Sequence, residues 1–293
     1  MKILAIIVTY NRKKLLQECI ESIKRQKAIQ PNILIVDNAS TDGTEKMFLN
    51  CKSSKIKYVN TGSNLGGAGG FNFGIKYAVK LNYDYLWIMD DDTIPEENAL
   101  FELMKCAKIL NNDFGFLASK VLWKNGEMCK MNIPEYSKTW FEKTEYLQYG
   151  MLRLESSSFV SCLIKKETVL RVGLPIKEFF IWGDDVEYTK RINKVNNNSY
   201  FVNQSIVIHK MAKNEKVDII EENNKNRISR FYNNYRNTFY IRKKEGKKKI
   251  FIYIITTAKD IFKVLFISKE YRFRKAWMIF KGFWGGVFFH PQV

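Results

Sequence analysis

The stretch Tyr85–Leu100, YLWIMDDDTIPEENAL, decides the fold because an apolar run leads directly into three adjacent carboxylates. The run before the triplet is short and apolar, as in a strand that is buried on both faces of a sheet. The three carboxylates of Asp90–Asp92 repel one another, and nothing in the neighbouring sequence offsets that repulsion unless a cation lies among them.

The triplet has two interpretations. Asp90 and Asp92 offer hard oxygen ligands, which suit Mg²⁺ or Mn²⁺ bound jointly by protein carboxylates and substrate phosphates. The alternative is a solvated turn in which Asp92 or Thr93 caps the helix that follows.

Three more apolar runs precede this strand, and segments with helical patterns separate them. This alternation predicts a parallel sheet that is covered by helices on both faces. The expected strands span residues 3–8, 33–37, 56–62 and 83–90. The expected helices span 13–27 and a segment opening at 40–48, and residues 66–82 are expected to form a glycine loop that leads into a third helix.

Polar clusters follow the strands where each strand ends. In parallel sheets, ligands bind beyond the carboxyl ends of the strands. We therefore expect a ligand-binding edge there, built from Thr9, Asn11, Arg12, Asp37, Asn64, Gly67, Asp90 and Asp91.

The glycine-rich stretch NLGGAGGFNFG, residues 64–74, is neither of two common phosphate-binding motifs. The spacing G-x-G-x-x-G fails because Asn72 stands where the third glycine belongs, and no G-K-[ST] follows. Two interpretations remain: a backbone that approaches a ligand at a helix N-terminus, or tight packing of the helix on the sheet.

The segment FFIWGDDVEYTKR, residues 179–191, resembles a loop that opens a helix. Asp184 and Glu187 have the spacing of a capping box. Asp185 would then begin the helix with a free, ionised carboxylate that can accept a proton from a hydroxyl. The alternative is that both aspartates only decorate the start of the helix.

His209 follows the apolar run of the strand predicted at residues 199–210. A lone histidine at a strand end more often has a structural role. Together with carboxylates, it could complete a metal site.

Five motifs in this order resemble glycosyltransferase family 2: IIVTYNR, ILIVDNASTDGT, NLGGAGGFNFG, WIMDDDT and WGDDVEY. The resemblance covers roughly residues 1–210. It implies the GT-A fold and inverting transfer from a nucleotide sugar. Within the family, the chain most resembles bacterial galactofuranosyltransferases and their rhamnosyltransferase relatives.

The resemblance implies roles for matching residues. Thr9, Asp37 and Asn64 would line the nucleotide pocket, with Asp37 near the base. The implied metal motif has Asp90 and Asp92 as its outer members, with Asp91 toward the sugar or ribose. The catalytic base would be Asp185 and the additional metal ligand His209.

The acceptor side is expected to include Trp182 and Asp184. Trp182 would pack against a sugar ring, and a core role is the alternative. Many relatives have Glu-Asp where this chain has Asp184-Asp185, and the capping argument favours Asp185 as the base.

The expected reaction is transfer of galactofuranose from UDP-galactofuranose to a hydroxyl of a glycan or lipid-linked acceptor in cell-surface polysaccharide synthesis. Mn²⁺ or Mg²⁺ would assist. Transfer of rhamnose from dTDP-rhamnose is the alternative within the family.

The chain has 293 residues and a formal net charge of +18, and most of that charge lies in the last third. Residues 210–293 hold 20 Lys and Arg against 7 Asp and Glu. We therefore expect a GT-A domain at 1–210 and a basic, aromatic, helical region at 211–293. No uncharged stretch there reaches the ~20 residues of a membrane span.

Basic helices with aromatic faces fit an anionic membrane interface, which predicts a cytoplasmic enzyme held peripherally on the inner face of the cell membrane. A helical subdomain with a contact between copies, giving a homo-oligomer, is one alternative. A nucleic-acid- or polyanion-binding protein is another, but it leaves the aspartates unexplained, so no nucleic-acid partner is expected.

The cysteines and the N-terminal sequence also favour a cytoplasmic location. The five cysteines are scattered without a CxxC pair, which predicts reduced thiols: Cys19, Cys51, Cys106, Cys129 and Cys162. The first apolar run is too short for a signal-peptide core, so we expect the chain to stay in the cell.

Overall fold

The computed structural model describes residues 1–49 and 53–292, and these form two compact units. The N-terminal unit comprises Met1–Lys177 and Asp185–Glu215. The C-terminal unit comprises Glu178–Asp184 and the chain from Lys216 onward. The division therefore falls five residues later than the expected boundary at residue 210, and the short segment Glu178–Asp184 joins the C-terminal unit.

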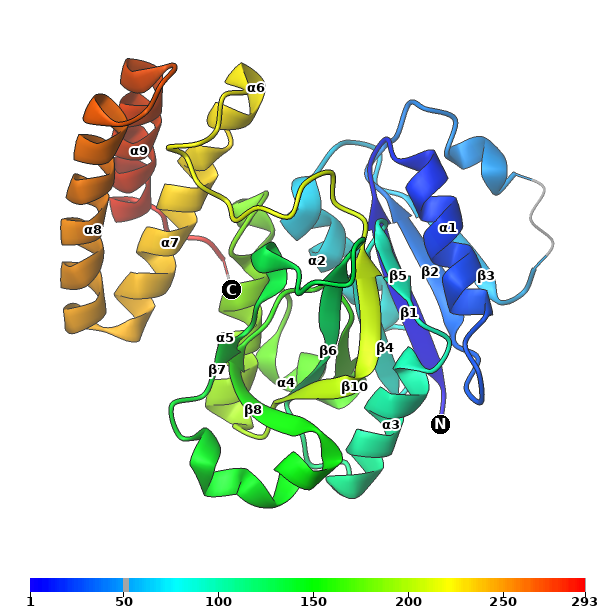
Figure 1. Cartoon of the computed structure of the whole chain (residues 1–293). Coiled ribbons are helices and arrows are strands. Elements are labelled where there is room, and N and C mark those ends of the chain that lie inside the picture. The colour runs from blue at the N-terminus through cyan, green and yellow to red at the C-terminus, as the bar shows by residue number, and fades with distance from the viewer. Residues whose placement is uncertain (50–52, 293) are drawn as a thin grey trace. The chain divides into compact units, whose positions relative to one another are not determined.

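The N-terminal unit is built on one ten-stranded sheet (Figure 1). The strand order is β3-β2-β1-β4-β9-β6-β10-β8-β7, and β5 pairs with β10. The strands are β1 (Ile3–Thr9), β2 (Asn32–Asp37), β3 (Ile56–Asn60), β4 (Tyr85–Asp90), β5 (Thr93–Pro95), β6 (Phe116–Trp123), β7 (Glu135–Tyr136), β8 (Met151–Ser156), β9 (Cys162–Lys165) and β10 (Tyr200–His209).

The α/β class and all four N-terminal strands are confirmed, and β1 to β4 pair in parallel as expected. The rest of the sheet is mixed, so the expectation of a mostly parallel sheet holds only for this half. β9 runs antiparallel to both β4 and β6, and β8 runs antiparallel to β10. Of the described strands in this half, only β6 and β10 pair in parallel, and helices α4 (Lys166–Val172) and α5 (Asp184–Val195) lie on the connection between them.

Both faces of the sheet are buried. Alternate residues of β1 point to opposite sides: Ala5 and Ile7 pack with α1 and α3, whereas Leu4 and Ile6 pack with α2 and α5. This double burial explains why the strands read as continuous apolar runs. The helices are α1 (Lys13–Lys24), α2 (Gly66–Ala78), α3 (Ala99–Ile109), α4 (Lys166–Val172) and α5 (Asp184–Val195).

The segment at 40–48 forms only a 3₁₀ turn, Glu45–Met47, and not the expected helix. Further 3₁₀ turns lie at Lys130–Asn132, Trp140–Tyr149 and Lys177–Phe179.

The glycines of α2 lie inside the helix, which begins at Gly66, and not in a loop before it. A Cβ added at Gly70 would lie 2.5 Å from Cγ1 of Val8. One at Gly74 would lie 2.7 Å from Cγ2 of Val36. These two glycines therefore let the helix pack closely on β1 and β2, which supports the packing interpretation.

The C-terminal unit is helical, as expected, with α6 (Lys225–Ile228), α7 (Phe231–Glu245), α8 (Lys247–Phe266) and α9 (Arg272–Val287). Its core joins Phe231 and Tyr235 of α7 to Val264 of α8 and Ile279 of α9. Among the described residues, no helix is both long and apolar enough to cross a membrane.

Candidate active site

The aspartate triplet lies at the carboxyl end of β4, beside the end of β1. Val8 pairs with Asp90 in the parallel register, so Thr9 reaches the triplet, and its Oγ1 donates a hydrogen bond to Oδ2 of Asp91 at 2.7 Å. Asp91 and Asp92 are only 3% and 4% exposed.

The solvated-turn alternative is therefore wrong. The residues after the triplet form β5, and α3 begins only at Ala99, so neither Asp92 nor Thr93 caps that helix.

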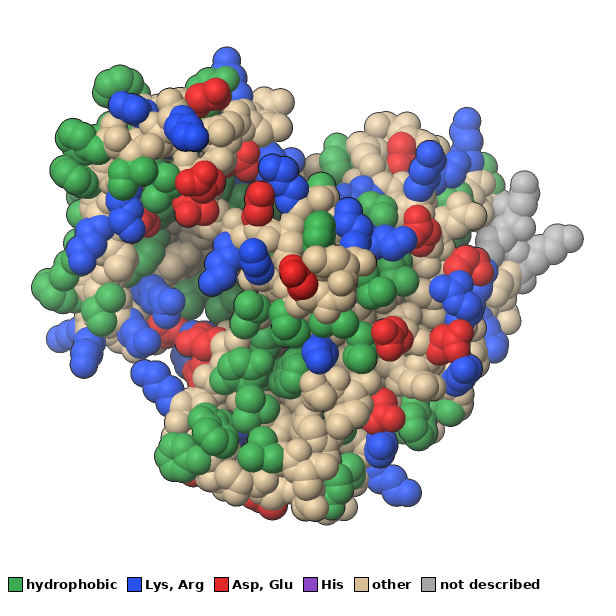
Figure 2. Space-filling view, in the orientation of Figure 1, with side chains coloured by type: hydrophobic (Ala, Val, Ile, Leu, Met, Phe, Trp, Pro, Cys, Tyr) green, Lys and Arg blue, Asp and Glu red, His purple; other side chains and the backbone are tan. Residues whose placement is uncertain are grey.

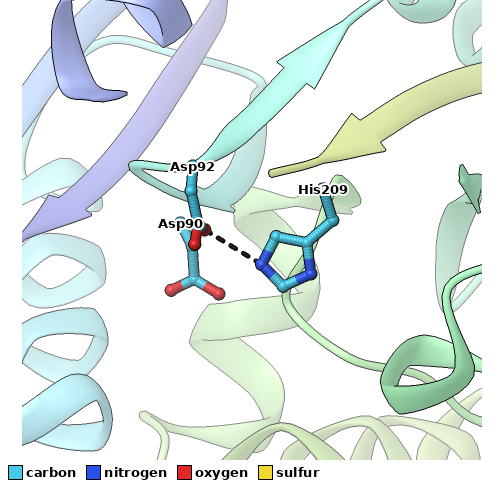
Figure 3. A group of neighbouring side chains, drawn as sticks. All are labelled: Asp90, Asp92 and His209. Atoms are coloured by element: carbon cyan, nitrogen blue, oxygen red, sulfur yellow. Dashed lines mark hydrogen bonds and ion pairs between the residues drawn. The ribbon is translucent and has the colours of Figure 1, made fainter. Parts of the chain in front are cut away.

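His209 closes the site from the opposite strand. β5 pairs antiparallel with β10, which places Thr93 beside His209 and brings the ring to Asp92. His209 Nε2 lies 2.9 Å from Oδ1 of Asp92. Asp90, Asp92 and His209 each offer a ligand atom, and these atoms all lie within 4.8 Å of one another (Figure 3). The structure thus brings together the three residues expected to bind the metal.

The second ring nitrogen of His209 contacts a residue that the sequence did not indicate. Nδ1 lies 2.7 Å from Oδ1 of Asn132, whose amide nitrogen donates to Ser158 at 3.0 Å. Because Asn132 presents its oxygen, Nδ1 carries a proton, and a divalent ion would replace the proton of Nε2 and take up its lone pair. Asn132 lies in the middle region, where no sequence pattern singled it out.

Arg12 brings positive charge to the triplet from the loop after β1. Its Nη1 lies 2.6 Å from Oδ2 of Asp92 and 3.3 Å from Oδ1 of Asp91. The guanidinium is half exposed, so it reaches the site from solvent. A half-exposed guanidinium above buried carboxylates is placed to contact a phosphate as well.

The pKa values show that negative charge remains uncompensated. Burial, followed by the charge of Asp92, raises the pKa of Asp90 to about 7. Burial also raises the pKa of Asp91 to about 6. At Asp92 burial acts in the same direction, but the hydrogen bond and charge of His209, together with the charge of Arg12, outweigh burial and lower the pKa.

Burial by itself would lower the pKa of His209. Hydrogen bonds with Asp92 and Cys129, together with the charges of Asp92 and Asp90, outweigh burial and raise the pKa to about 10. Two carboxylates and an imidazole fit a divalent ion such as Mn²⁺ or Mg²⁺, which would replace these protons as the counter-charge.

Asp185 lies at the same edge of the sheet as the triplet. Phe159, in the connection between β8 and β9, and Val186 both present backbone N–H groups to its carboxylate. The Val186 bond measures 2.8 Å. β9 runs antiparallel to β4 and pairs Cys162 with Ile88, so its start lies at the carboxyl end of β4. Burial raises the pKa of Asp185 to about 6, and the N–H groups partly oppose this.

Glu187, the expected partner of Asp184 in a capping box, is held by Arg191. Both carboxylate oxygens of Glu187 accept hydrogen bonds from Arg191, at 3.0 and 2.7 Å. Helix α5 also begins at Asp184, one residue before the predicted first helical residue. This i, i+4 contact between Glu187 and Arg191 is bidentate, because the arginine fork binds both oxygens.

Asp184 and Trp182 belong to the C-terminal unit. The ring of Trp182 packs 5.2 Å from that of Phe231, which is the core role weighed as an alternative. Its backbone carbonyl accepts a hydrogen bond from Asn237. The acceptor roles of Trp182 and Asp184 stay predictions.

The expected nucleotide pocket is organised around Asp37. Its carboxylate is fully buried and accepts hydrogen bonds from the Tyr58 hydroxyl at 2.7 Å and from the Ser40 backbone at 2.9 Å. Asn11 then joins the loops after β1 and β2, since its Oδ1 accepts from the Thr41 backbone at 2.7 Å. The structure thus brings Asn11 and Asp37 to one loop cluster.

Asn64 and Gly67 lie at the start of α2. Oδ1 of Asn64 accepts a hydrogen bond from the Gly66 backbone at 2.9 Å. A Cβ added at Gly67 would meet nothing within 4 Å. Packing therefore does not explain Gly67, in contrast to Gly70 and Gly74.

All four cysteines in the described part of the chain are buried free thiols: Cys19, Cys106, Cys129 and Cys162. Cys51 lies outside the described residues.

Comparison with known proteins identifies the family. The model of glycosyl transferase family 2 matches residues 4–148, which include the triplet and the loops after β1 and β2. The chain belongs to glycosyl transferase family 2 and carries its glycosyltransferase domain.

Curated galactofuranosyltransferases are about a quarter identical to the chain over the aligned residues. It is 26% identical over 203 residues to galactofuranosyltransferase GlfT1 of Mycolicibacterium smegmatis. The match covers 64% of each protein, so the chain spans less than two thirds of that relative.

Solved structures confirm the GT-A fold. A crystal structure of GalNAc-T7 with UDP, GalNAc and Mn²⁺ superposes with a TM-score of 0.59 at 15% identity, over 72% of this chain and 43% of that one. Staphylococcus aureus TarS superposes with a TM-score of 0.54 at 16% identity, over 98% of this chain and 44% of that one.

Proposed function

We propose that this chain transfers galactofuranose from UDP-galactofuranose to a hydroxyl of a glycan or lipid-linked acceptor in cell-surface polysaccharide synthesis, with inversion and with a divalent cation. One observation carries the proposal: Asp90, Asp92 and His209 form a ligand cluster, and Asp185 lies at the same edge of the sheet. The similarity to GlfT1 supports the choice of sugar.

Asp90, Asp92 and His209 would hold Mn²⁺ or Mg²⁺, which when bound neutralises charge on the leaving nucleoside diphosphate. Thr9 fixes Asp91 through its hydroxyl, so that the third carboxylate keeps its orientation. Arg12 is placed to contact the diphosphate from the solvent side.

Asp185 acts as the general base in this proposal. Its raised pKa makes it a better proton acceptor than an exposed aspartate. It takes the proton of the acceptor hydroxyl while that oxygen attacks the anomeric carbon on the face opposite the diphosphate. A single displacement forms the new glycosidic bond, breaks the bond to the diphosphate and inverts the anomeric configuration.

We also propose that the enzyme works at the cytoplasmic face of the cell membrane, held peripherally on anionic lipid. The net positive charge of residues 210–293 supports this placement.

A donor comparison tests the sugar assignment. The purified chain is incubated with Mn²⁺ and either UDP-galactofuranose or dTDP-rhamnose, with a lipid-linked glycan as acceptor, and nucleoside diphosphate release is followed. Turnover with UDP-galactofuranose is expected. Turnover with dTDP-rhamnose alone would reassign the sugar, and turnover with neither donor would remove the proposal.

A further inference from the structure

Helix α9 carries two apolar stripes on opposite sides, and only one of them is packed. Its buried residues lie at Lys275, Ile279, Gly282 and Gly286. Two positions before each of them is an exposed aromatic residue, and two positions along an α-helix correspond to a rotation of about 200°. These aromatics, together with Phe288 just after the helix, are 46% to 84% exposed: Phe273, Trp277, Phe280, Trp284 and Phe288.

Helix α8 repeats the arrangement. Tyr253, Thr257, Asp260 and Val264 face the unit's interior, where Tyr253 donates to the backbone oxygen of Tyr235 at 2.9 Å. The residue two positions before each of these is apolar and exposed, so these residues form a stripe on the opposite side of α8. The larger ones and the neighbouring Phe266 are 41% to 66% exposed: Phe251, Ile255, Phe262 and Phe266.

Both exposed stripes point away from α7. The packed side of α9 meets α7 so closely that a Cβ at Gly286 would lie 2.5 Å from Cβ of Phe239. On the packed side of α8, Oδ2 of Asp260 accepts a hydrogen bond from the Tyr235 hydroxyl at 3.0 Å. The exposed stripes lie opposite these contacts, so the two helices present apolar faces to the same outer side of the unit.

The charges beside these stripes are almost all positive. Lys247–Phe266 and Arg272–Val287 are described throughout, and the one carboxylate within them is Asp260, which is engaged by Tyr235. Figure 2 shows Lys and Arg interspersed with hydrophobic side chains over the region of α8 and α9. The exposed cations of the two helices are Lys247, Lys248, Lys259, Lys263, Arg272 and Lys281.

We propose that α8 and α9 lie in the headgroup layer of an anionic bilayer, with the α8 stripe and the α9 aromatic stripe inserted toward the acyl chains. The proposal deepens the membrane attachment proposed above and rests on it. Tryptophan and phenylalanine at helical spacing insert at this depth, and lysines beside them contact lipid phosphates. A second copy of the same surface would bring like charges together, and nucleic acid would leave the apolar stripes in water.

The experiment is vesicle flotation of the full chain, with phosphatidylcholine vesicles with and without phosphatidylglycerol, at low and high salt. Brominated lipids in the same vesicles report insertion of Trp277 and Trp284 through fluorescence quenching. The wild-type chain is expected to float with anionic vesicles at low salt, to retain part of that binding at high salt, and to show quenching.

Two double variants separate the contributions. Phe273→Ser with Phe280→Ser should lower binding at least tenfold at both salt concentrations. Lys259→Ser with Lys263→Ser should lower binding mainly at low salt. The matched control, Trp140→Ser with Phe141→Ser, removes two exposed aromatics of the N-terminal unit and should bind as wild type.

The failures can be told apart. A wild-type chain that ignores anionic vesicles would overturn the membrane attachment itself. If the Phe273/Phe280 variant floats like wild type, the assignment of the α9 stripe as the inserted surface would be wrong, while membrane attachment itself would stand. Dissociation of a wild-type dimer by that variant, seen by light scattering without vesicles, would assign the surface to a second copy instead. Sugar transfer to a soluble acceptor, measured in parallel, tests the reaction independently of all three.

Discussion

Asn132 accepts a hydrogen bond from Nδ1 of His209 at 2.7 Å, and this contact turns Nε2 toward Asp92. We predict that Asn132→Leu weakens Mn²⁺ binding by about 10- to 100-fold, because the ring loses the partner that fixes its tautomer. Asn132→Asp should retain most of the affinity, since a carboxylate also accepts from Nδ1. Free Mn²⁺ measured by electron paramagnetic resonance reports the affinity without turnover. Equal affinities for wild type and Asn132→Leu would contradict this role.

The base assignment predicts a separation between turnover and donor binding. Asp185→Asn should lower kcat by roughly 10²–10⁴-fold, because the variant cannot accept the proton in the transition state. Its dissociation constant for UDP should stay near the wild-type value. The neighbouring variant Asp184→Asn is the control and should keep most of the turnover. An exchange of these two results would move the base to Asp184.

The raised pKa of Asp185 predicts how the rate depends on pH. A general base must be ionised, so kcat/KM should fall about tenfold per pH unit below about 6 and level off above it. The measurement is the pH profile of kcat/KM with saturating Mn²⁺. A profile that stays flat down to pH 5 would argue against this base.

The same shift has a consequence for stability. A carboxyl with a raised folded-state pKa binds its proton more tightly in the folded protein than in the unfolded chain. The folded state therefore loses stability as the pH rises from the ordinary aspartate range through about 6. Asp185→Asn has no carboxyl to titrate at this position and therefore does not lose this stability. The Tm of the variant minus that of wild type should rise between pH 4 and about 6. No change in the Tm difference between pH 4 and pH 7 would contradict it.

We predict that substitution by alanine affects protein stability differently at two glycines of α2. Gly70→Ala places a methyl group 2.5 Å from Cγ1 of Val8 and should lower the free energy of unfolding by about 1–3 kcal/mol. Gly67→Ala meets no atom within 4 Å and should leave stability unchanged or raise it by up to about 1 kcal/mol. Urea unfolding measures both. Equal losses in the two variants would show that packing does not distinguish these positions.

The sequence predicted the parts of the fold that local patterns control. Strands buried on both faces read as apolar runs, so β1 to β4 and the edge that carries Asp37 and Asp90 were recognisable. Five motifs in order then indicated the family. The mixed half of the sheet was not predictable, because β9 enters between β4 and β6 through contacts that no local period encodes.

The site shows the same limit. Asp90, Asp92 and His209 were expected to meet, and they do. Asn132 was missed because it acts by contacting His209, which lies 77 residues further along the chain. The partner of Glu187 was also missed: Arg191, one turn later, donates to both of its carboxylate oxygens.

Dependence of sugar transfer on the Asp90–Asp92–His209 cluster is the central claim. It is tested most directly by following transfer from UDP-galactofuranose by NMR, with Mn²⁺, with excess chelator, and for Asp92→Asn. We predict an inverted product with Mn²⁺, loss of transfer in chelator with recovery on adding Mn²⁺, and at least a roughly 100-fold lower rate for Asp92→Asn. Full transfer in excess chelator, or a product of retained configuration, would contradict the account.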